Sequence, residues 1–276
     1  MIYGCAAWGF RETPLEQQLT VTRELGLSVL ELGIAGHPND FLRQTADAES
    51  IRRVRDWFDR AGIRLQCAST GNDFTHADAA ACRASLEQVK KVIEVAALTG
   101  VKWLRIFAGF SPAAEVTGAR WDLMITCLNA AIKHATEHGL RLGIETHGGV
   151  TTVPGGIRHF HSTSSQPELL LLMLEQLDKR AGIVFDPANL GAVGLNETAI
   201  INLFRRLRSR IVYLHLKDFR RLDAAALTPC ACGEGQLNWA ELNMALASFD
   251  GPGLIEYELP GDIVAGLQRS LHFLRG

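Results

Sequence analysis

Eight short apolar runs alternate with eight amphipathic stretches along the whole chain. The apolar runs predict strands at 2–7, 28–33, 64–69, 101–107, 141–145, 182–186, 211–215 and 253–256. The amphipathic stretches predict helices at 15–25, 48–61, 79–99, 121–138, 168–178, 197–208, 239–248 and 263–274. Strict alternation indicates βαβ units around a parallel sheet. Eight units in 276 residues are typical of one (β/α)8 TIM barrel, a single domain spanning 1–276.

A doubly wound open sheet is the alternative architecture. It would favour a glycine-rich phosphate fingerprint after the first strand, and the segment AAWGFRETP at 6–14 has no such pattern. Glycines at the predicted junctions between a helix and the next strand suit the left-handed turn that ends a helix. They are Gly26, Gly62, Gly100, Gly139 and Gly182.

Composition narrows the class of protein. The chain has 28 Lys and Arg against 30 Asp and Glu, a formal charge of −2, which argues against a strongly basic nucleic-acid binder. No apolar run approaches the length of a membrane span, and the first residues lack a basic, apolar leader. Six cysteines in a chain of this length do not resemble a disulfide framework. We therefore expect a cytoplasmic protein with reduced thiols and no membrane or nucleic-acid partner.

Polar residues gather at the ends of the last four predicted strands. The segments GIETHGG, GIVFDPANL, VYLHLKDF and GLIEYELP each follow or end an apolar run. Strand residues two positions apart face the same side, so the two polar residues of a segment point the same way. The residues concerned are Glu145, His147, Asp186, His215, Lys217, Glu256 and Glu258. The carboxyl ends of barrel strands form the face where barrel enzymes place their active sites.

Carboxylates that converge in a barrel mouth repel one another unless a cation neutralises them. An oxygen-rich set with one imidazole suits Mn²⁺, Mg²⁺ or Co²⁺, with Zn²⁺ as an alternative. The sequence therefore predicts one divalent metal ion. Two long connections, at 146–166 and 219–238, leave the same face and are expected to be lids or walls of the site.

The strings ETHGG, FDPAN, HLKD, GEGQLNW and IEYE resemble the xylose isomerase-like barrels, which include sugar phosphate isomerases and epimerases. The resemblance implies metal ligands at Glu145, Asp186, His215 and Glu256, with Glu258 the competing ligand on the last strand. It also implies a small polyhydroxylated carbonyl substrate. The metal would polarise the carbonyl and stabilise an enediolate, while Glu145 and Glu256 act as base and acid. Family members often form homo-oligomers, although no segment here marks an interface.

Further residues are expected to contact substrate. Arg105 is charged within an apolar run and needs a partner, either the substrate or Glu145. His147, Lys217 and Glu258 face the predicted site, and Trp8 follows the first strand, as Phe10 does. His37 follows the second strand and is expected to wall the pocket together with Trp8 and Phe10. His159 and His161 lie in the long loop, where exposed histidines are common.

Three alternative functions remain open. The string RIFAG followed by ETH resembles dehydratases of the keto-inositol or 3-dehydroshikimate type. Asn189 stands where tagatose and psicose epimerases usually have a histidine, which weakens a ketohexose 3-epimerase assignment. An abasic-site endonuclease would need histidines for a trinuclear zinc site, and QCAST, FAG and CACGEG lack them. A non-catalytic sugar-binding barrel is the third alternative.

Overall fold

Eight parallel strands close into a barrel, as the alternation predicts. The computed structural model describes residues 1–223, 226–259 and 261–276. Around the barrel the strands are β1 (Ile2–Cys5), β12 (Pro252–Ile255), β9 (Ile211–Leu216), β8 (Gly182–Phe185), β5 (Arg141–Glu145), β4 (Trp103–Ile106), β3 (Arg64–Ser69) and β2 (Val29–Gly33). Each overlaps a predicted strand. The (β/α)8 prediction is confirmed.

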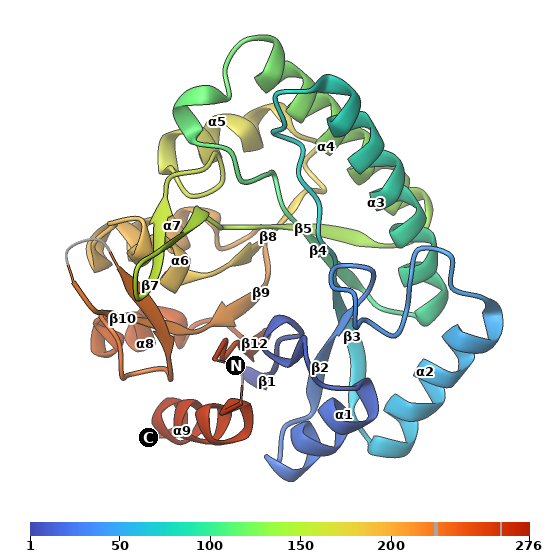
Figure 1. Cartoon of the computed structure of the whole chain (residues 1–276), viewed down its shortest axis with the longest axis vertical. Coiled ribbons are helices and arrows are strands. Elements are labelled where there is room, and N and C mark those ends of the chain that lie inside the picture. Colours follow the sequence, from blue (N-terminus) through green and yellow to red (C-terminus); the bar gives the residue numbers. More distant parts are fainter. Residues whose placement is uncertain (224–225, 260) are drawn as a thin grey trace.

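Helices surround the barrel strands (Figure 1). They are α1 (Leu15–Glu24), α2 (Ala48–Ala61), α3 (Ala79–Thr99), α4 (Ala119–Glu137), α5 (Pro167–Gln176), α7 (Glu197–Leu207), α8 (Trp239–Leu246) and α9 (Ile263–Arg275). Helix α2 shows how the sequence sets the bounds: the Asp47 side chain accepts a hydrogen bond from the Ser50 amide, and Gly62 ends the helix at φ 67°. Within the described ranges, no helix has the length and apolar character to cross a membrane.

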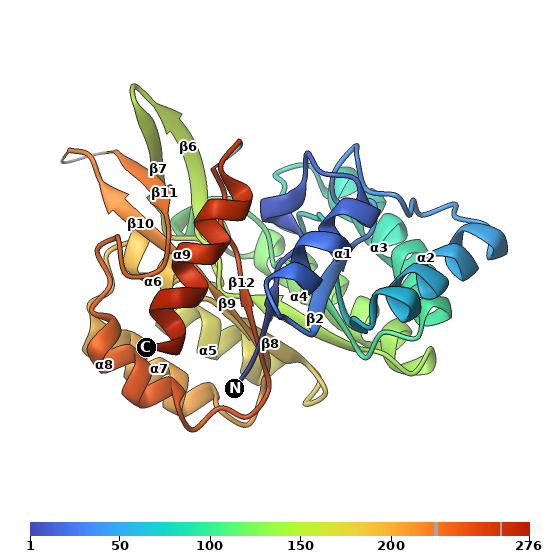
Figure 2. The same ribbon diagram turned by 90° about the horizontal axis from the view of Figure 1, so that it is seen from below.

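The long connections are more ordered than the sequence indicates. They contain β6 (Gly149–Val153), β7 (Gly156–Phe160), β10 (Asp218–Arg221) and β11 (Leu227–Cys230), which form a small sheet in the order β10-β11-β7-β6. Figure 2 shows this sheet projecting beyond one end of the barrel. Leu227 of one connection pairs with Ile157 of the other, a long-range contact that local patterns do not reveal. Short helices η1 (Trp8–Phe10), η2 (Ala113–Glu115) and α6 (Pro187–Ala192) complete the chain.

The prediction that Gly182 ends a helix is wrong. Gly182 is the first residue of β8 and does not have a positive φ, unlike the other four junction glycines. A Cβ there would lie 2.7 Å from Cγ1 of Val212, so close packing of β8 against β9 requires the glycine.

Side chains inside the barrel form layers. The Tyr213 hydroxyl of β9 donates a 2.6 Å hydrogen bond to Glu31 of β2, although the two strands are not neighbours, so both side chains point into the interior. A buried apolar cluster there includes Val29, Cys67, Val184, Tyr213 and Leu254. Two positions later along the same strands stand Glu31, Ser69, Asp186, His215 and Glu256. Because strand residues alternate between faces, the polar layer lies directly above an apolar floor.

Asp218 joins the small sheet to the segment that follows it. Its carboxylate accepts hydrogen bonds from the amides of Phe219, Gly233 and Gly235 at 2.9–3.2 Å and from the Trp239 indole at 2.8 Å. A Cβ on Gly235 would lie 2.1 Å from this carboxylate. The aspartate of HLKD therefore holds the GEGQLNW segment in place, which explains why the chain carries both strings.

We expect Asp218→Ala to lower the free energy of unfolding by about 3 kcal/mol, because several buried donors lose their acceptor. Chemical denaturation measures this change. Asp250→Ala is the control, because its side chain is 98% exposed and its loss should cost less than about 0.5 kcal/mol. Equal stability of the two variants would show that Asp218 does not anchor the segment.

Candidate active site

Four buried side chains meet at the carboxyl ends of neighbouring barrel strands. Glu145 ends β5, Asp186 follows β8, His215 lies in β9 and Glu256 follows β12. Each offers one oxygen or nitrogen atom, and these four atoms all lie within 4.8 Å of one another. The structure thus brings together the residues that the sequence singled out as metal ligands. Glu258, the competing choice, is outside this group.

His215 is held between carboxylates. Its Nδ1 lies 3.3 Å from Oε1 of Glu145 and 3.8 Å from Oε1 of Glu256. Its Nε2 lies 3.3 Å from Oε1 of Glu31. The three carboxylates outweigh the effect of burial, which lowers the pKa of His215, and raise that pKa well above its usual value.

Glu31 is a site residue that the sequence analysis missed. It is fully buried, and besides Tyr213 and His215 it contacts the Ala7 amide at 3.0 Å. Burial raises the pKa of Glu31, but His215, Arg105 and the Tyr213 hydroxyl lower it by more, so that the pKa is about 2. The sequence signal that could have identified Glu31 is its charge within the apolar run VLELG, two residues after Val29. A carboxylate on the far nitrogen of a metal-binding histidine fixes the ring orientation and the tautomer.

Both oxygens of Glu145 have partners. Oε2 lies 3.1 Å from Nε of Arg105, and Oε1 accepts a 3.2 Å hydrogen bond from Asn189. Arg105 also donates to the Thr70 carbonyl at 2.8 Å, and its guanidinium lies 4.2 Å from the centre of the Phe107 ring. Burial raises the pKa of Glu145, but His215 and Arg105 together hold it well below its usual range.

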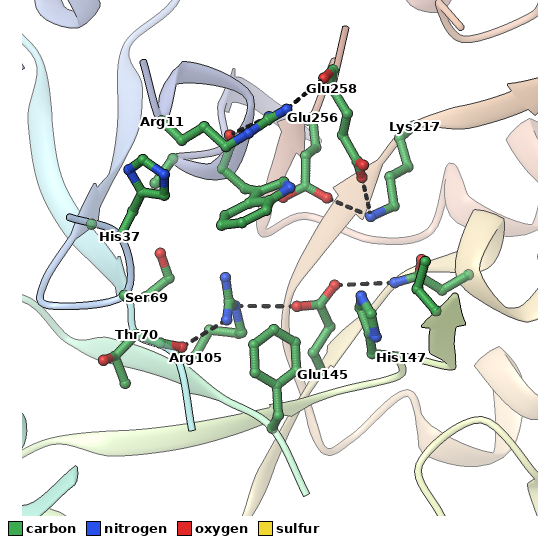
Figure 3. A pocket seen from close by; sticks show the side chains of 18 of the residues that line it. Arg11, His37, Ser69, Thr70, Arg105, Glu145, His147, Lys217, Glu256 and Glu258 are labelled. Atoms are coloured by element: carbon green, nitrogen blue, oxygen red, sulfur yellow. Dashed lines mark hydrogen bonds and ion pairs between the residues drawn. The ribbon is translucent and has the colours of Figure 1, made fainter. Parts of the chain in front are cut away.

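Lys217 supplies the positive charge nearest the other carboxylates (Figure 3). Its Nζ lies 2.6 Å from Glu256, 2.8 Å from Glu258 and 3.3 Å from Oδ2 of Asp186. Three close carboxylates outweigh burial and raise the pKa of Lys217 well above its usual value. Glu258 therefore forms an ion pair with Lys217 and is not one of the four converging side chains.

The contacts of Asp186 indicate whether the four converging side chains can bind a cation. Its Oδ1 caps α6 by accepting the amides of Ala188 and Asn189 at 2.8 and 2.9 Å. Its Oδ2 is buried and, among the described residues, has no hydrogen-bond donor in correct geometry, although Lys217 lies at ion-pair distance. Burial raises the pKa of Asp186 to about 7, and Glu145 and Glu256 contribute. An unsatisfied buried oxygen within a set of three carboxylates and an imidazole fits a divalent ion.

A cavity of about 610 Å³ opens above this group. Its lining includes all of the predicted substrate contacts: Trp8, Arg105, His147, Lys217 and Glu258. His37 and His159 also line it, whereas Phe10 is buried outside it and His161 does not reach it.

His147 stands among aromatic rings in this cavity. It lies edge-on to Phe107 and Phe110, with ring centres 5.1 and 5.4 Å away. Its Nδ1 contacts the Gly148 carbonyl, which assigns the proton to that nitrogen. Burial lowers its pKa to about 4, so the ring is neutral near pH 7 and Nε2 can accept a hydrogen bond.

Solved structures of known proteins share the fold. The chain aligns along its full length with a probable 3-DHS dehydratase, AsbF, from Bacillus anthracis (15% identity, 99% of that chain, TM-score 0.80). It also aligns along its full length with the 3-keto-D-glucoside 4-epimerase YcjR from E. coli (15% identity, 99% of that chain, TM-score 0.74). A xylose isomerase domain protein from Planctomyces limnophilus matches 94% of the chain (21% identity, 91% of that chain, TM-score 0.72). No curated protein matches the sequence.

At sequence identities of 15–21%, these structures show the shared fold alone. Membership of a family is shown by a match to a family model. The model, described as a xylose isomerase-like TIM barrel, matches residues 19–276, which include all four converging side chains. The match agrees with the resemblance that the strand-end strings indicate. The chain belongs to the xylose isomerase-like TIM barrel family.

Proposed function

We propose that the protein is a divalent-metal-dependent isomerase or epimerase that removes a proton next to the carbonyl of a small polyhydroxylated substrate. The observation that carries the proposal is the buried group of Glu145, Asp186, His215 and Glu256 at the base of a cavity. Similar structures include a D-tagatose 3-epimerase-like protein and an L-ribulose 3-epimerase. A 3-epimerase inverts a carbon centre of a sugar, which agrees with this reaction class.

The four residues would hold the ion, which would supply Lewis-acid polarisation of the substrate carbonyl. Mn²⁺, Mg²⁺ and Co²⁺ suit the donor set best, with Zn²⁺ as an alternative. Arg105 and His147 line the same cavity and can donate to and accept from substrate hydroxyls. The apolar floor and the burial of the four side chains weaken solvent screening beneath the site, which strengthens the electrostatic contacts there.

Glu256 is the better proton carrier of the two glutamates. Arg105 lies at ion-pair distance from one oxygen of Glu145, and Asn189 and His215 face the other, so these contacts stabilise the charged form of Glu145 and make it the weaker base. Among the described residues, Oε2 of Glu256 has one hydrogen-bond donor, the ammonium of Lys217, which also has Glu258 as a partner. We therefore assign Glu256 as base and Glu145 as a ligand and positioning group, with Lys217 as the candidate for returning the proton.

The dehydratase alternative draws on the same observation. Stereochemical inversion needs a second proton carrier on the opposite face of the substrate, but Arg105 and Asn189 stabilise the charged form of Glu145, and Lys217 lies beside Glu256. Elimination of a β-hydroxyl needs only one base and an acid that protonates the leaving oxygen. Lys217 lies beside Glu256 and could act as that acid. The probable 3-DHS dehydratase is also similar in structure over nearly its whole length.

We expect Glu256→Gln to lower turnover at least about 100-fold, because the amide cannot accept the proton. Deuterium uptake from D₂O by ketoses and keto-cyclitols measures the first step, and mass spectrometry separates the two classes, since only a dehydratase releases one water. Glu241→Gln on the exposed face of α8 is the matched control. Full activity of Glu256→Gln with saturating metal would remove the assignment.

Glu31 should control metal affinity through His215. Glu31→Gln keeps the side-chain volume but removes the negative charge that faces Nε2 of His215. We therefore expect the Kd for Mn²⁺ to rise about 10- to 100-fold. Calorimetric titration of the metal measures this change. Tyr213→Phe is the control, because it removes a different hydrogen bond of Glu31 and leaves the His215 and Ala7 contacts. An equal loss in both variants would point to general disturbance of the barrel interior.

A further inference from the structure

The cavity extends well beyond the converging side chains. Its volume, about 610 Å³, falls within the range of sites that hold drug-sized ligands. The polar side chains at its base are almost completely buried, with Arg105 at 5% and Lys217 at 4% exposure. Two apolar lining residues are open to solvent: Trp8 at 41% and Val150 at 43%. The cavity therefore changes from charged at its base to apolar at its mouth.

One side of the mouth is an apolar wall, which we define as Phe107, Phe110, Val150, Ile157 and Pro229. The β6–β7 hairpin contributes two of these residues on one face, because Val150 pairs with His159 and Ile157 lies two positions before His159. The rings of Phe107 and Phe110 lie 4.7 Å apart and form a continuous aromatic surface with His147. Flat apolar groups pack favourably on such a surface.

His159 adds one uncharged polar group to this wall. Its ring packs 4.8 Å from Phe219, and neither ring nitrogen has a hydrogen-bond partner within the described part of the chain. Unpaired buried polar atoms are costly in proteins, and a ligand in the cavity could supply the missing partner.

The two cations at the base of the cavity are paired with carboxylates. Arg105 faces Glu145, and Lys217 faces Asp186, Glu256 and Glu258. The Arg11 guanidinium lies over Trp8 and donates to the carbonyls of Trp8 and Glu258, while Asp40 adds another carboxylate to the lining. The lining and Asp186 beneath it supply five carboxylates against the cations of Arg11, Arg105 and Lys217, so a bound divalent ion brings the sum of these charges to zero and leaves no surplus for a phosphate or carboxylate group.

From these contacts we infer that the natural substrate is uncharged and has two parts: a keto-polyol ring at the base, and a flat apolar substituent, such as an aryl group, against the apolar wall. The identity of the reacting ring rests on the proposed function. The apolar substituent and the absence of charge rest on the wall and on the neutralised cations. Sugar phosphates and keto acids are disfavoured because Arg105 and Lys217 at the base already face carboxylates, and a bound divalent ion only balances the charge of the site.

The test compares ligands on the Mn²⁺-loaded protein by calorimetry. The probes are the phenyl and methyl 3-keto-β-D-glucosides, 3-dehydroshikimate and fructose 6-phosphate. We expect the phenyl compound to bind about tenfold tighter than the methyl compound, because the ring leaves water for the apolar wall. Both anionic probes should bind more weakly than the phenyl compound. Equal binding of phenyl and methyl compounds, or tighter binding of either anion, would overturn the inference.

The double variant Val150→Ser with Ile157→Ser should reduce the phenyl-to-methyl affinity ratio at least about threefold, because it removes apolar contact area. Val264→Ser on α9 is the matched control, since Val264 is similarly exposed at 40% but does not line the cavity. An unchanged ratio in the double variant would contradict the role of the wall. Solvent deuterium exchange on the same probes separates the two proposals: phenyl preference in binding without exchange on any probe supports this inference and counts against the proposed chemistry.

Discussion

Repulsion among buried carboxylates governs the centre of this protein. Glu145, Asp186 and Glu256 are buried where the barrel interior meets the cavity, Glu258 lies beside them, and burial leaves their charges weakly screened. Lys217 relieves part of this repulsion through three ion pairs. Oδ2 of Asp186 remains without a hydrogen bond among the described residues, so the arrangement still favours a further cation. The proposed metal site, the assignment of the base and the preference for an uncharged substrate all follow from this charge balance.

The architecture and the converging residues could be predicted because both follow from local periodicity. Alternating helices and strands specify the barrel, and polar residues at strand ends must meet once the barrel closes. Glu31 escaped prediction because it lies within β2 rather than at its end, where a single charge in an apolar run does not reveal its partner. Its role depends on His215, which lies across the barrel interior and far along the sequence.

The small sheet escaped prediction for a related reason. Strands β7 and β11 come from connections that leave different barrel strands, and their pairing depends on how the barrel places those connections. The string HLKD illustrates how one motif can serve two purposes. His215 and Lys217 point toward the cavity base, whereas Asp218 turns away and binds the backbone of the GEGQLNW segment. The sequence alone groups these residues as one feature.

The separation between barrel and hairpin has a consequence for how such proteins diversify. The residues proposed for chemistry belong to the barrel strands, which cannot change without disturbing a closed, layered interior. The apolar wall draws Val150 and Ile157 from a hairpin that projects beyond the barrel (Figure 2). Exchange of this hairpin between homologues would therefore give a new ligand preference on an unchanged reactive centre.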